Sequence, residues 1–286
     1  MRPLLTRGNV SCCDALMYVT RQPCAALASH VDKLWCCDGH PGSNGKDRAL
    51  PDGRFQLAFS LADGPISALA DPIGDGGGAA PSLLIGIRSR FAMIDTAKLR
   101  SAMGVVFRPG GMHPFLNMPA DAFHDKNVSL DLIWGSMVQT LRDQLRSAND
   151  PGKKFQILEI ALLSRINERV RLNTAVHYAL QEFARKPQIP MVRELAREAG
   201  LSRRRFAQVF REQIGLTPKL YCRLQRFQSA LKQIASSASV DWAQISLAAG
   251  YCDQAHLAHE FRNFSGLSPS AYLAGRQRSA SNASID

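Results

Sequence analysis

The feature that most constrains the fold of this chain is an internal duplication in its last third. One copy covers residues 199–221 and the other residues 249–272. Each copy begins with Ala-Gly, continues through a segment that contains Phe, and then has Gly-Leu-Thr-Pro or Gly-Leu-Ser-Pro, followed by a Tyr. The offset is 50 residues at the first glycine and 51 from Phe206 and Leu257 onward, because the second copy has one extra residue in its turn. Such self-similarity is typical of a repeated supersecondary unit. The sequence therefore predicts one small helical unit built twice.

The first copy has the pattern of a helix-turn-helix unit. Residues 192–199 predict a short amphipathic helix that turns Leu195 and Ala199 inward. Gly200 supplies the positive φ that most side chains avoid, and Ser202 is placed to cap the second helix, the recognition helix. The apolar residues of that recognition helix predict its buried face: Phe206, Val209 and Phe210.

The second copy repeats this pattern. Gly250 provides the turn, and Asp253 is placed to cap the recognition helix. The residues that hold the two helices of this unit inward are Trp242, Ile245, Ala249, Leu257 and Phe261.

A long helix is predicted between the copies, capped by Thr217 and begun by Pro218. Its apolar stripe would pack against both units and consists of Leu220, Leu224, Phe227, Leu231 and Ile234. Such a connector fixes the separation of the recognition helices, and successive major-groove faces of DNA lie roughly 34 Å apart. A helical domain without a DNA role is the alternative, but it would not explain the Arg, Gln and His side chains on the outer faces of both recognition helices.

The charge distribution points in the same direction. The formal net charge is +11, and residues 168–286 hold 17 basic and 9 acidic residues, whereas the first 167 residues hold 18 and 15. A basic C-terminal part favours a polyanionic partner, because cations that replace phosphate counterions supply much of nucleic-acid affinity.

The N-terminal part predicts a β-rich domain, a small barrel or sandwich. Strand-like segments at residues 55–61, 83–87 and 103–107 are separated by turn signals such as Pro51-Asp52-Gly53. Helical spacing begins with one apolar stripe, which predicts a single helix ending at residues 149–152: Leu130, Ile133, Met137, Leu141 and Leu145. A second helix carries Phe155, Leu158, Leu162 and Ile166. These two helices would serve either interdomain packing or a dimer interface.

The motif of the first copy is Ala-Gly-Leu-Ser-x3-Phe-x3-Phe-Arg, followed by Gly-Leu-Thr-Pro. The motif of the second copy is Gly-Tyr-x-Asp-Gln-Ala-His-Leu-x2-Glu-Phe-Arg, followed by Gly-Leu-Ser-Pro-x2-Tyr. These duplicated motifs resemble the AraC/XylS family of transcription regulators over about residues 190–275. The resemblance implies a seven-helix DNA-binding domain with two helix-turn-helix units. Leu-Pro-Asp-Gly at residues 50–53 and Phe-Arg-Pro-Gly-Gly at residues 107–111 resemble the cupin-like sensor region of one subgroup.

The expected fold class is therefore α+β, with a β-rich cupin-like N-terminal domain and an all-α C-terminal domain. The expected divisions are a sensor at residues 1–128, a helical connector and candidate dimerisation element at 129–167, the DNA-binding domain at 168–275 and a flexible tail at 276–286.

The resemblance implies a sequence-specific, DNA-binding transcription regulator that responds to a ligand or signal through its N-terminal domain. The implied partners are double-stranded DNA, a small-molecule effector, a second copy of the chain and, for an activator, RNA polymerase. The alternative is a β-barrel binding or catalytic domain of the metal-cupin kind, fused to a DNA-binding domain. We expect no enzymatic activity and no cofactor.

Carried over by motif, the base-reading positions are Arg204, Ala207 and Gln208 in the first unit, and Gln254, Ala255, His256 and Ala258 in the second. The candidates for phosphate contact are Arg203, Arg205, Arg211, His259 and Arg262. Arg bridges guanine O6 and N7 and Gln bridges adenine N6 and N7, so Arg204, Gln208 and Gln254 are the strongest readers.

The sequence departs from the family in two places. Ala207 offers only a methyl contact, and His259 stands where the family usually has Arg; a histidine is largely neutral at pH 7. Glu260 lies between His259 and Arg262 and is expected to oppose the phosphate field. The second unit is therefore predicted to bind DNA more weakly than the first.

Competing motifs are weaker. The run Gly74-Asp75-Gly76-Gly77-Gly78-Ala79 matches a dinucleotide fingerprint, but Pro81 and a strand-like segment follow where a helix is needed, which favours a loop. A metal site needs clustered ligands, whereas the candidate histidines are scattered: His30, His40, His113 and His124. His113 is better interpreted as a loop or pocket-lining residue. Cys24 lacks the Pro-Cys-His-Arg context of an alkyl-transfer nucleophile.

No window approaches the roughly 18–20 apolar residues of a membrane span, and the apolar run in residues 1–8 ends after two leucines, unlike a secretory signal. We therefore expect a cytoplasmic protein. The seven cysteines, which include the pairs Cys12-Cys13 and Cys36-Cys37, favour incidental thiols over a disulfide framework, with a redox sensor as the alternative.

Overall fold

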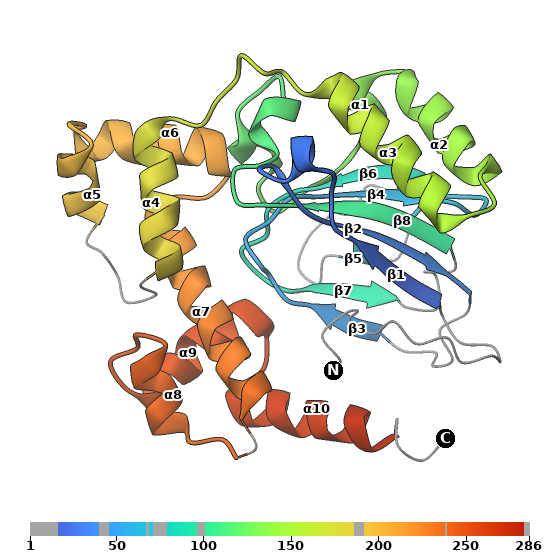
Figure 1. Ribbon diagram of the computed structural model, residues 1–286. Coiled ribbons are helices and arrows are strands. Elements are labelled where there is room, and N and C mark those ends of the chain that lie inside the picture. Colours follow the sequence, from blue (N-terminus) through green and yellow to red (C-terminus); the bar gives the residue numbers. More distant parts are fainter. Residues whose placement is uncertain are drawn as a thin grey trace.

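The computed structural model describes residues 17–39, 46–66, 69–70, 79–95, 101–185, 192–237 and 239–282. In this part of the chain, strands come first and helices follow, and the two regions lie side by side (Figure 1). The strands are β1 (Met17–Arg21), β2 (Val31–Asp38), β3 (Lys46–Ala49), β4 (Gln56–Ser60), β5 (Leu69–Ala70), β6 (Ser82–Ile85), β7 (Ala92–Asp95), β8 (Ser101–Phe107) and β9 (Asn127–Ser129). The expected α+β order, with a β-rich N-terminal domain before a helical C-terminal domain, is confirmed.

The strands form two sheets. One has the order β1-β2-β8-β4-β6-β9 and the other β3-β7-β5, and the paired strands in both are antiparallel. The strand-like segments that the sequence predicted become β4, β6 and β8, which are neighbours in the larger sheet. A small apolar cluster that includes Ala58, Leu83 and Ile94 brings together residues of both sheets.

Three helices cover the outer face of the larger sheet: α1 (Asp131–Trp134), α2 (Met137–Ser147) and α3 (Pro151–Arg165) (Figure 1). The prediction of one continuous helix from residue 130 is wrong, because Gly135 adopts a φ of +71° and ends α1. The apolar stripe survives the break, and Leu130, Leu141 and Leu145 are all buried.

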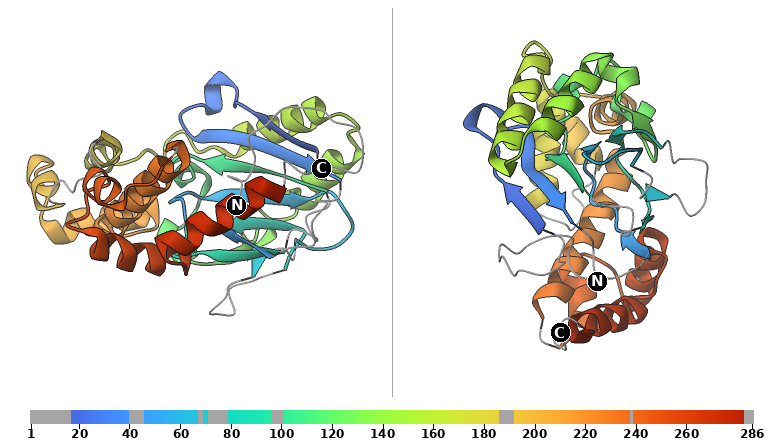
Figure 2. Two further views of the ribbon diagram at one scale, coloured as in Figure 1. Left: turned by 90° about the horizontal axis from the view of Figure 1, so that it is seen from below. Right: turned by 90° about the vertical axis from the view of Figure 1, so that its right-hand side faces the viewer.

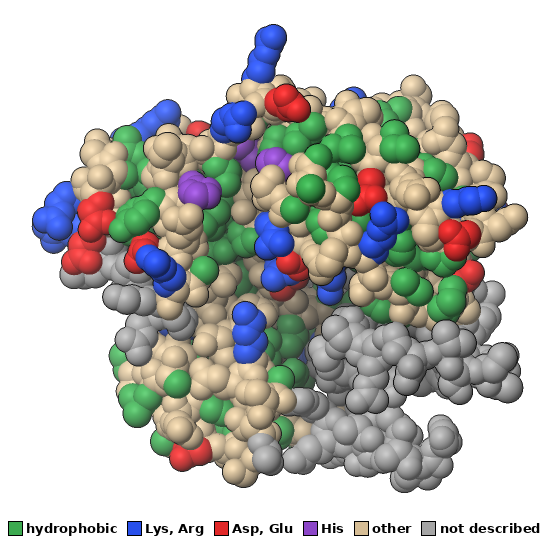
Figure 3. Space-filling model, viewed as in Figure 1, with side chains coloured by type: hydrophobic (Ala, Val, Ile, Leu, Met, Phe, Trp, Pro, Cys, Tyr) green, Lys and Arg blue, Asp and Glu red, His purple; other side chains and the backbone are tan. Residues whose placement is uncertain are grey.

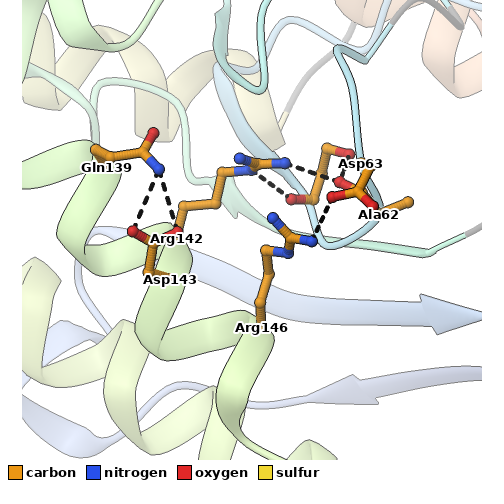
Figure 4. A network of polar contacts seen from close by, with 7 residues as sticks. Ala62, Asp63, Gln139, Arg142, Asp143 and Arg146 are labelled. Atoms are coloured by element: carbon orange, nitrogen blue, oxygen red, sulfur yellow. Dashed lines mark hydrogen bonds and ion pairs between the residues drawn. The ribbon is translucent and has the colours of Figure 1, made fainter.

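Polar contacts fasten α2 to the end of β4 (Figure 4). The Arg142 side chain is only 6% exposed, and it donates to the carbonyl oxygens of Ser60 and Ala62 at 2.8 Å each. One turn later, Arg146 pairs with Asp63 at 2.5 Å. The Ser60 hydroxyl also donates to the Ala62 carbonyl oxygen at 3.1 Å, so the end of β4 is held by both side chains.

The C-terminal part is helical: α4 (Thr174–Arg185), α5 (Val192–Glu198), α6 (Arg203–Ile214), α7 (Pro218–Ser236), α8 (Trp242–Ala248), α9 (Gln254–Ser265) and α10 (Pro269–Asn282). The predicted caps are confirmed, because the side chains of Ser202, Thr217 and Asp253 accept hydrogen bonds from the first turns of α6, α7 and α9. The turn residues Gly200 and Gly250 have φ of +66° and +83°. Helix α10 continues to Asn282, past residue 276 where the sequence predicts the tail to begin.

Helix α7 packs against both helix-turn-helix units, as its apolar stripe predicted. Its Tyr221 ring lies 5.7 Å from that of Phe210 in α6, and its Phe227 ring lies 5.1 Å from those of Phe261 and Phe264 in α9. The two recognition helices are therefore mounted on one 19-residue helix.

Several sequence features lie outside the described residues: the run Gly74–Gly78, the pair Cys12-Cys13, His40 and residues 1–8. Within the described part, no helix combines the length and the apolar character that a membrane span requires. The described cysteines are free thiols, and burial raises the pKa of Cys37 and Cys222 to about 12.

Candidate nucleic-acid interface

The first recognition helix, α6, presents most of its predicted DNA-binding residues to solvent. Arg203, Arg204, Arg205, Gln208 and Arg211 are exposed, and Ala207 is half-buried. Residues 204, 207, 208 and 211 follow the spacing i, i+3, i+4, i+7, so they share one face of the helix. The opposite face is held in the core by Phe206, Phe210 and Ile214.

Gln208 keeps the groups that adenine recognition needs. Its Nε2 donates to Oε1 of Glu212 at 2.8 Å, one turn further along α6. An amide nitrogen carries two N–H donors. The second N–H and the amide oxygen therefore remain available for a bidentate contact with adenine.

The second recognition helix, α9, presents an outer face at equivalent positions. Gln254, Ala255, His259 and Arg262 are exposed, whereas His256 and Ala258 are half-buried. The His256 ring packs edge-on against Tyr251 with 5.3 Å between centroids, and its Nδ1 lies 3.5 Å from the backbone nitrogen of Cys252. An accepting Nδ1 leaves Nε2 as the ring donor.

Glu260 does not face the DNA side, so the expectation that it opposes the phosphate field is wrong. Its side chain is 5% exposed, and both carboxylate oxygens accept from Arg223 of α7, Oε2 from Nε at 2.7 Å and Oε1 from Nη2 at 2.8 Å. Burial alone would raise the pKa of Glu260, but the hydrogen bonds and charge of Arg223 outweigh it and hold that pKa below its usual range. In the sequence, the position of Glu260 between Leu257 and Phe261, which both face inward, indicates that its side chain is buried.

A second arginine of α7 holds the turn of the same unit. Arg226 is 6% exposed, donates from Nη1 to the carbonyl oxygen of Gly250 at 3.2 Å and lies over the Tyr251 ring at 5.5 Å. Arg226 is therefore a buried basic residue, and Arg223 turns its guanidinium toward Glu260 while its side chain remains 33% exposed.

Arg211, a predicted phosphate contact, is paired with the β-rich domain. Its Nε lies 2.9 Å from Oδ2 of Asp121, in the short 3-10 helix Ala120–Phe123 that packs against α6. The Arg211 side chain remains 53% exposed. The C-terminal end of the base-reading stripe therefore adjoins the N-terminal domain.

The two turn motifs of the N-terminal domain lie against the helical domain. At the first, Gln228 of α7 donates from Nε2 to the carbonyl oxygen of Pro51 at 2.6 Å, and burial raises the pKa of the neighbouring Asp52. At the second, Gly110 has a φ of +76°, and a Cβ there would lie 2.8 Å from the Leu172 side chain. These motifs thus form part of the interdomain contact.

The N-terminal domain also contacts the second unit, at the C-terminal end of α9. Arg48 of β3 donates to the carbonyl oxygen of Ser265 at 3.4 Å and lies over the Phe91 ring at 4.6 Å. The same ring packs beside Gly266, where α9 ends. Figures 1 and 2 show α10 starting from this corner and running below the smaller sheet.

Comparisons with known proteins agree with the two-part architecture. Residues 195–275 match a family described as a helix-turn-helix domain, and residues 19–129 match one described as a domain of unknown function, DUF6597. An uncharacterized HTH-type transcriptional regulator of Haemophilus influenzae is 35% identical over 120 residues, which cover 41% of this chain and 37% of that protein.

Two more distant similarities extend further along the chain. The probable transcriptional regulator LumQ of Photobacterium leiognathi is 25% identical over 171 residues, which cover 56% of this chain and 67% of that protein. A crystal structure of ToxT from Vibrio cholerae O395 aligns with a TM-score of 0.47 and 10% identity, covering 90% of this chain and 98% of that one.

Proposed function

We propose that this chain, which belongs to the AraC-type helix-turn-helix transcription regulators, binds double-stranded DNA in a sequence-specific way and thereby regulates transcription. The observation that carries the proposal is the mounting of two recognition helices with exposed Arg, Gln and His side chains on the single helix α7. We assign sensing to residues 1–128, the helical connector to 129–167 and DNA binding to 168–275.

The side chains suggest a division of roles. Arg204, Gln208 and Gln254 have the donors and acceptors for direct base readout. The small side chains at Ala207, Ala255 and Ala258 allow close approach and methyl contact, and His256 offers a donor. The remaining exposed residues would neutralise phosphates and position the helices: Arg203, Arg205, Arg211, His259 and Arg262.

Selection from a random duplex library with the full chain tests this proposal. The expected product is a bipartite site whose two blocks are centred about 10–10.5 base pairs apart. Fluorescence anisotropy on that site should show binding that weakens steeply with salt, because several phosphate contacts release counterions. A library without enriched sequences, or binding that barely responds to salt, would contradict the proposal.

Control by the N-terminal domain is the second part of the proposal. Its support is the set of contacts that this domain makes with α7 through Pro51, with α6 through Asp121 and with the end of α9 through Arg48. A ligand or signal that shifts the N-terminal domain would move both units. The metal-cupin alternative lacks a ligand cluster within the described residues. A thermal-shift screen of small molecules, followed by anisotropy with each binder, tests whether occupancy changes DNA affinity.

We also propose a second copy of the chain as a partner, docked on the outer face of α2 and α3. A groove of about 700 Å³ lies between these helices, and its lining includes Met137, Ile157 and Ile160. Ile160 is 68% exposed, Leu132 of the neighbouring helix α1 is 80% exposed, and hydrophobic side chains are visible over these helices in Figure 3. A groove lined by exposed apolar side chains such as Ile160 suits an isologous contact between two copies of the chain. Sedimentation of wild type and Ile160→Glu tests it, with a dimer expected only for the wild type. For an activator, RNA polymerase would be a further partner.

A further inference from the structure

The two recognition helices differ at one equivalent position on their inner faces. With the offset of 51 residues, Val209 of α6 corresponds to Glu260 of α9. Both side chains are buried, at 7% and 5% exposure. The first unit therefore packs an apolar side chain where the second unit buries a carboxylate.

The carboxylate of Glu260 is bound in a directional way. Arg223 donates to both oxygens through its fork, and its guanidinium lies over the Phe264 ring of the same helix at 5.7 Å. A bidentate Arg–carboxylate pair is satisfied in one relative orientation only. Apolar contacts such as those of Val209 are not directional. The pair thus restrains rotation and sliding of α9 on α7 in a way that α6 lacks.

Arg223 stabilises the ionised form of Glu260, but stability alone does not require an ion pair at this place. Glu260 is buried, whereas the Arg223 side chain remains 33% exposed. Taking the carboxylate out of water carries a desolvation cost that offsets its attraction to the guanidinium. Replacing a buried ion pair by apolar residues of similar volume is therefore often neutral or stabilising. Val209 at the equivalent position of the first unit demonstrates that an apolar residue fits this place.

We propose that Glu260 and Arg223 are positioning residues that set the orientation of α9, and with it the base-pair preference of the second unit. This inference rests on the proposed function. It places specificity control on two side chains that need not touch DNA. The outer residues Gln254 and His256 would read bases only while the inner pair holds their helix in register.

The test is the paired substitution Arg223→Leu with Glu260→Val, which gives α9 the apolar inner face of α6. We expect the melting temperature to equal or exceed that of the wild type, and affinity for non-cognate duplexes to stay within twofold. Affinity for the selected site should fall about tenfold, and library selection should lose preference only in the block read by the second unit. The matched control is Glu182→Gln with Arg185→Gln, which removes an ion pair of α4 and should change neither block.

Unchanged preference in both blocks, or an equal loss in both, overturns the inference. If the paired variant fails to fold, Glu260→Gln keeps the shape and removes the charge, and the same block should weaken to a smaller extent. A wild type without any selected sequence overturns the proposed function instead. Hydrogen exchange then decides the positioning role. Faster exchange of the α9 amides in the paired variant than in the wild type, with unchanged exchange of α6, supports it. Equal exchange of α9 in the paired variant and the wild type overturns it.

Discussion

The recognition helices α6 and α9 follow one plan, but their outer faces differ at equivalent positions. The outer stripe of α6 consists of Arg204, Ala207, Gln208 and Arg211, and that of α9 of Ala255, Ala258, His259 and Arg262. Only one permanent cation remains in the second stripe. The first unit is therefore suited to supply affinity, whereas the second depends on a few contacts made in the right place.

The two helices are also held from different sides. Helix α6 has an apolar inner face, and its outer stripe reaches the N-terminal domain through the Arg211–Asp121 pair. Helix α9 is held from inside by Arg223, and the N-terminal domain contacts its end through Arg48. A duplicated motif can thus keep one fold while one copy couples to a neighbouring domain and the other is fixed by its connector.

The largest effect should follow from removing the cations of α6. Arg203→Ala with Arg205→Ala deletes two exposed charges near the start of the helix. Each charged contact is worth about 1.5–3 kcal/mol, so we expect a loss of roughly 100-fold or more on every duplex. The slope of log affinity against log salt should fall by about 2. Anisotropy at several salt concentrations measures both quantities.

The matched variant in the second unit is His259→Ala with Arg262→Ala. It should cost clearly less affinity and less salt slope. An equal cost for the two pairs would show that the units share the electrostatic contribution and that the larger number of exposed cations on α6 has no consequence.

The next effect separates base reading from anchoring within α6. Gln208→Ala should lower affinity for the selected site by about 1–3 kcal/mol and relax preference at one or two positions. Arg211→Ala should instead weaken binding to all sequences alike, because phosphate contacts carry no sequence information. Library selection with each variant measures this difference. Indistinguishable preference profiles would contradict the assigned roles.

Much of the helical domain could be predicted because its signals are local. The glycine turns, the caps at Ser202, Thr217 and Asp253, and the α7 stripe each depend on residues within a few positions of one another. The break at Gly135 was missed because the apolar spacing continues through it. The stripe records which face is buried, and it does not record whether the backbone is continuous.

The contacts that distinguish the two units could not be predicted in the same way. Asp121 and Arg211 are far apart in the chain and meet only because the N-terminal domain packs on α6. Arg223 contributes to the net positive charge of residues 168–286, and the sequence does not reveal which of these cations turn inward. The buried place of Glu260 could have been inferred from its position between Leu257 and Phe261, but its partner could not.

A smaller effect should appear when the link between α6 and the N-terminal domain is cut. Asp121→Asn removes the charge that competes with phosphate for Arg211. The pair is partly exposed, and such pairs contribute up to about 1 kcal/mol, so we expect up to roughly fivefold tighter binding to any duplex. Asp63→Asn is the control, because it cuts an ion pair with Arg146 on α2, away from both units. In the Arg211→Ala background the gain should vanish, and a gain that persists there would assign it to another contact.

The smallest effect tests whether the weaker unit can be brought toward the stronger one. His259→Arg adds a permanent cation and a forked donor at an exposed position of α9 that corresponds to Gln208 in α6. One added phosphate contact should raise the salt slope by up to roughly 1 and tighten binding about twofold to threefold. His177→Arg adds the same charge on α4, outside both recognition helices, and serves as the control. The gain should depend on the inner pair: in the Arg223→Leu, Glu260→Val background, α9 is no longer held in one orientation, so the new arginine should add less affinity. Anisotropy titrations measure this for five proteins: the wild type, His259→Arg, the His177→Arg control, the paired-substitution background, and that background with His259→Arg. An equal gain in both backgrounds would mean that charge alone, and not the orientation of α9, limits the second unit.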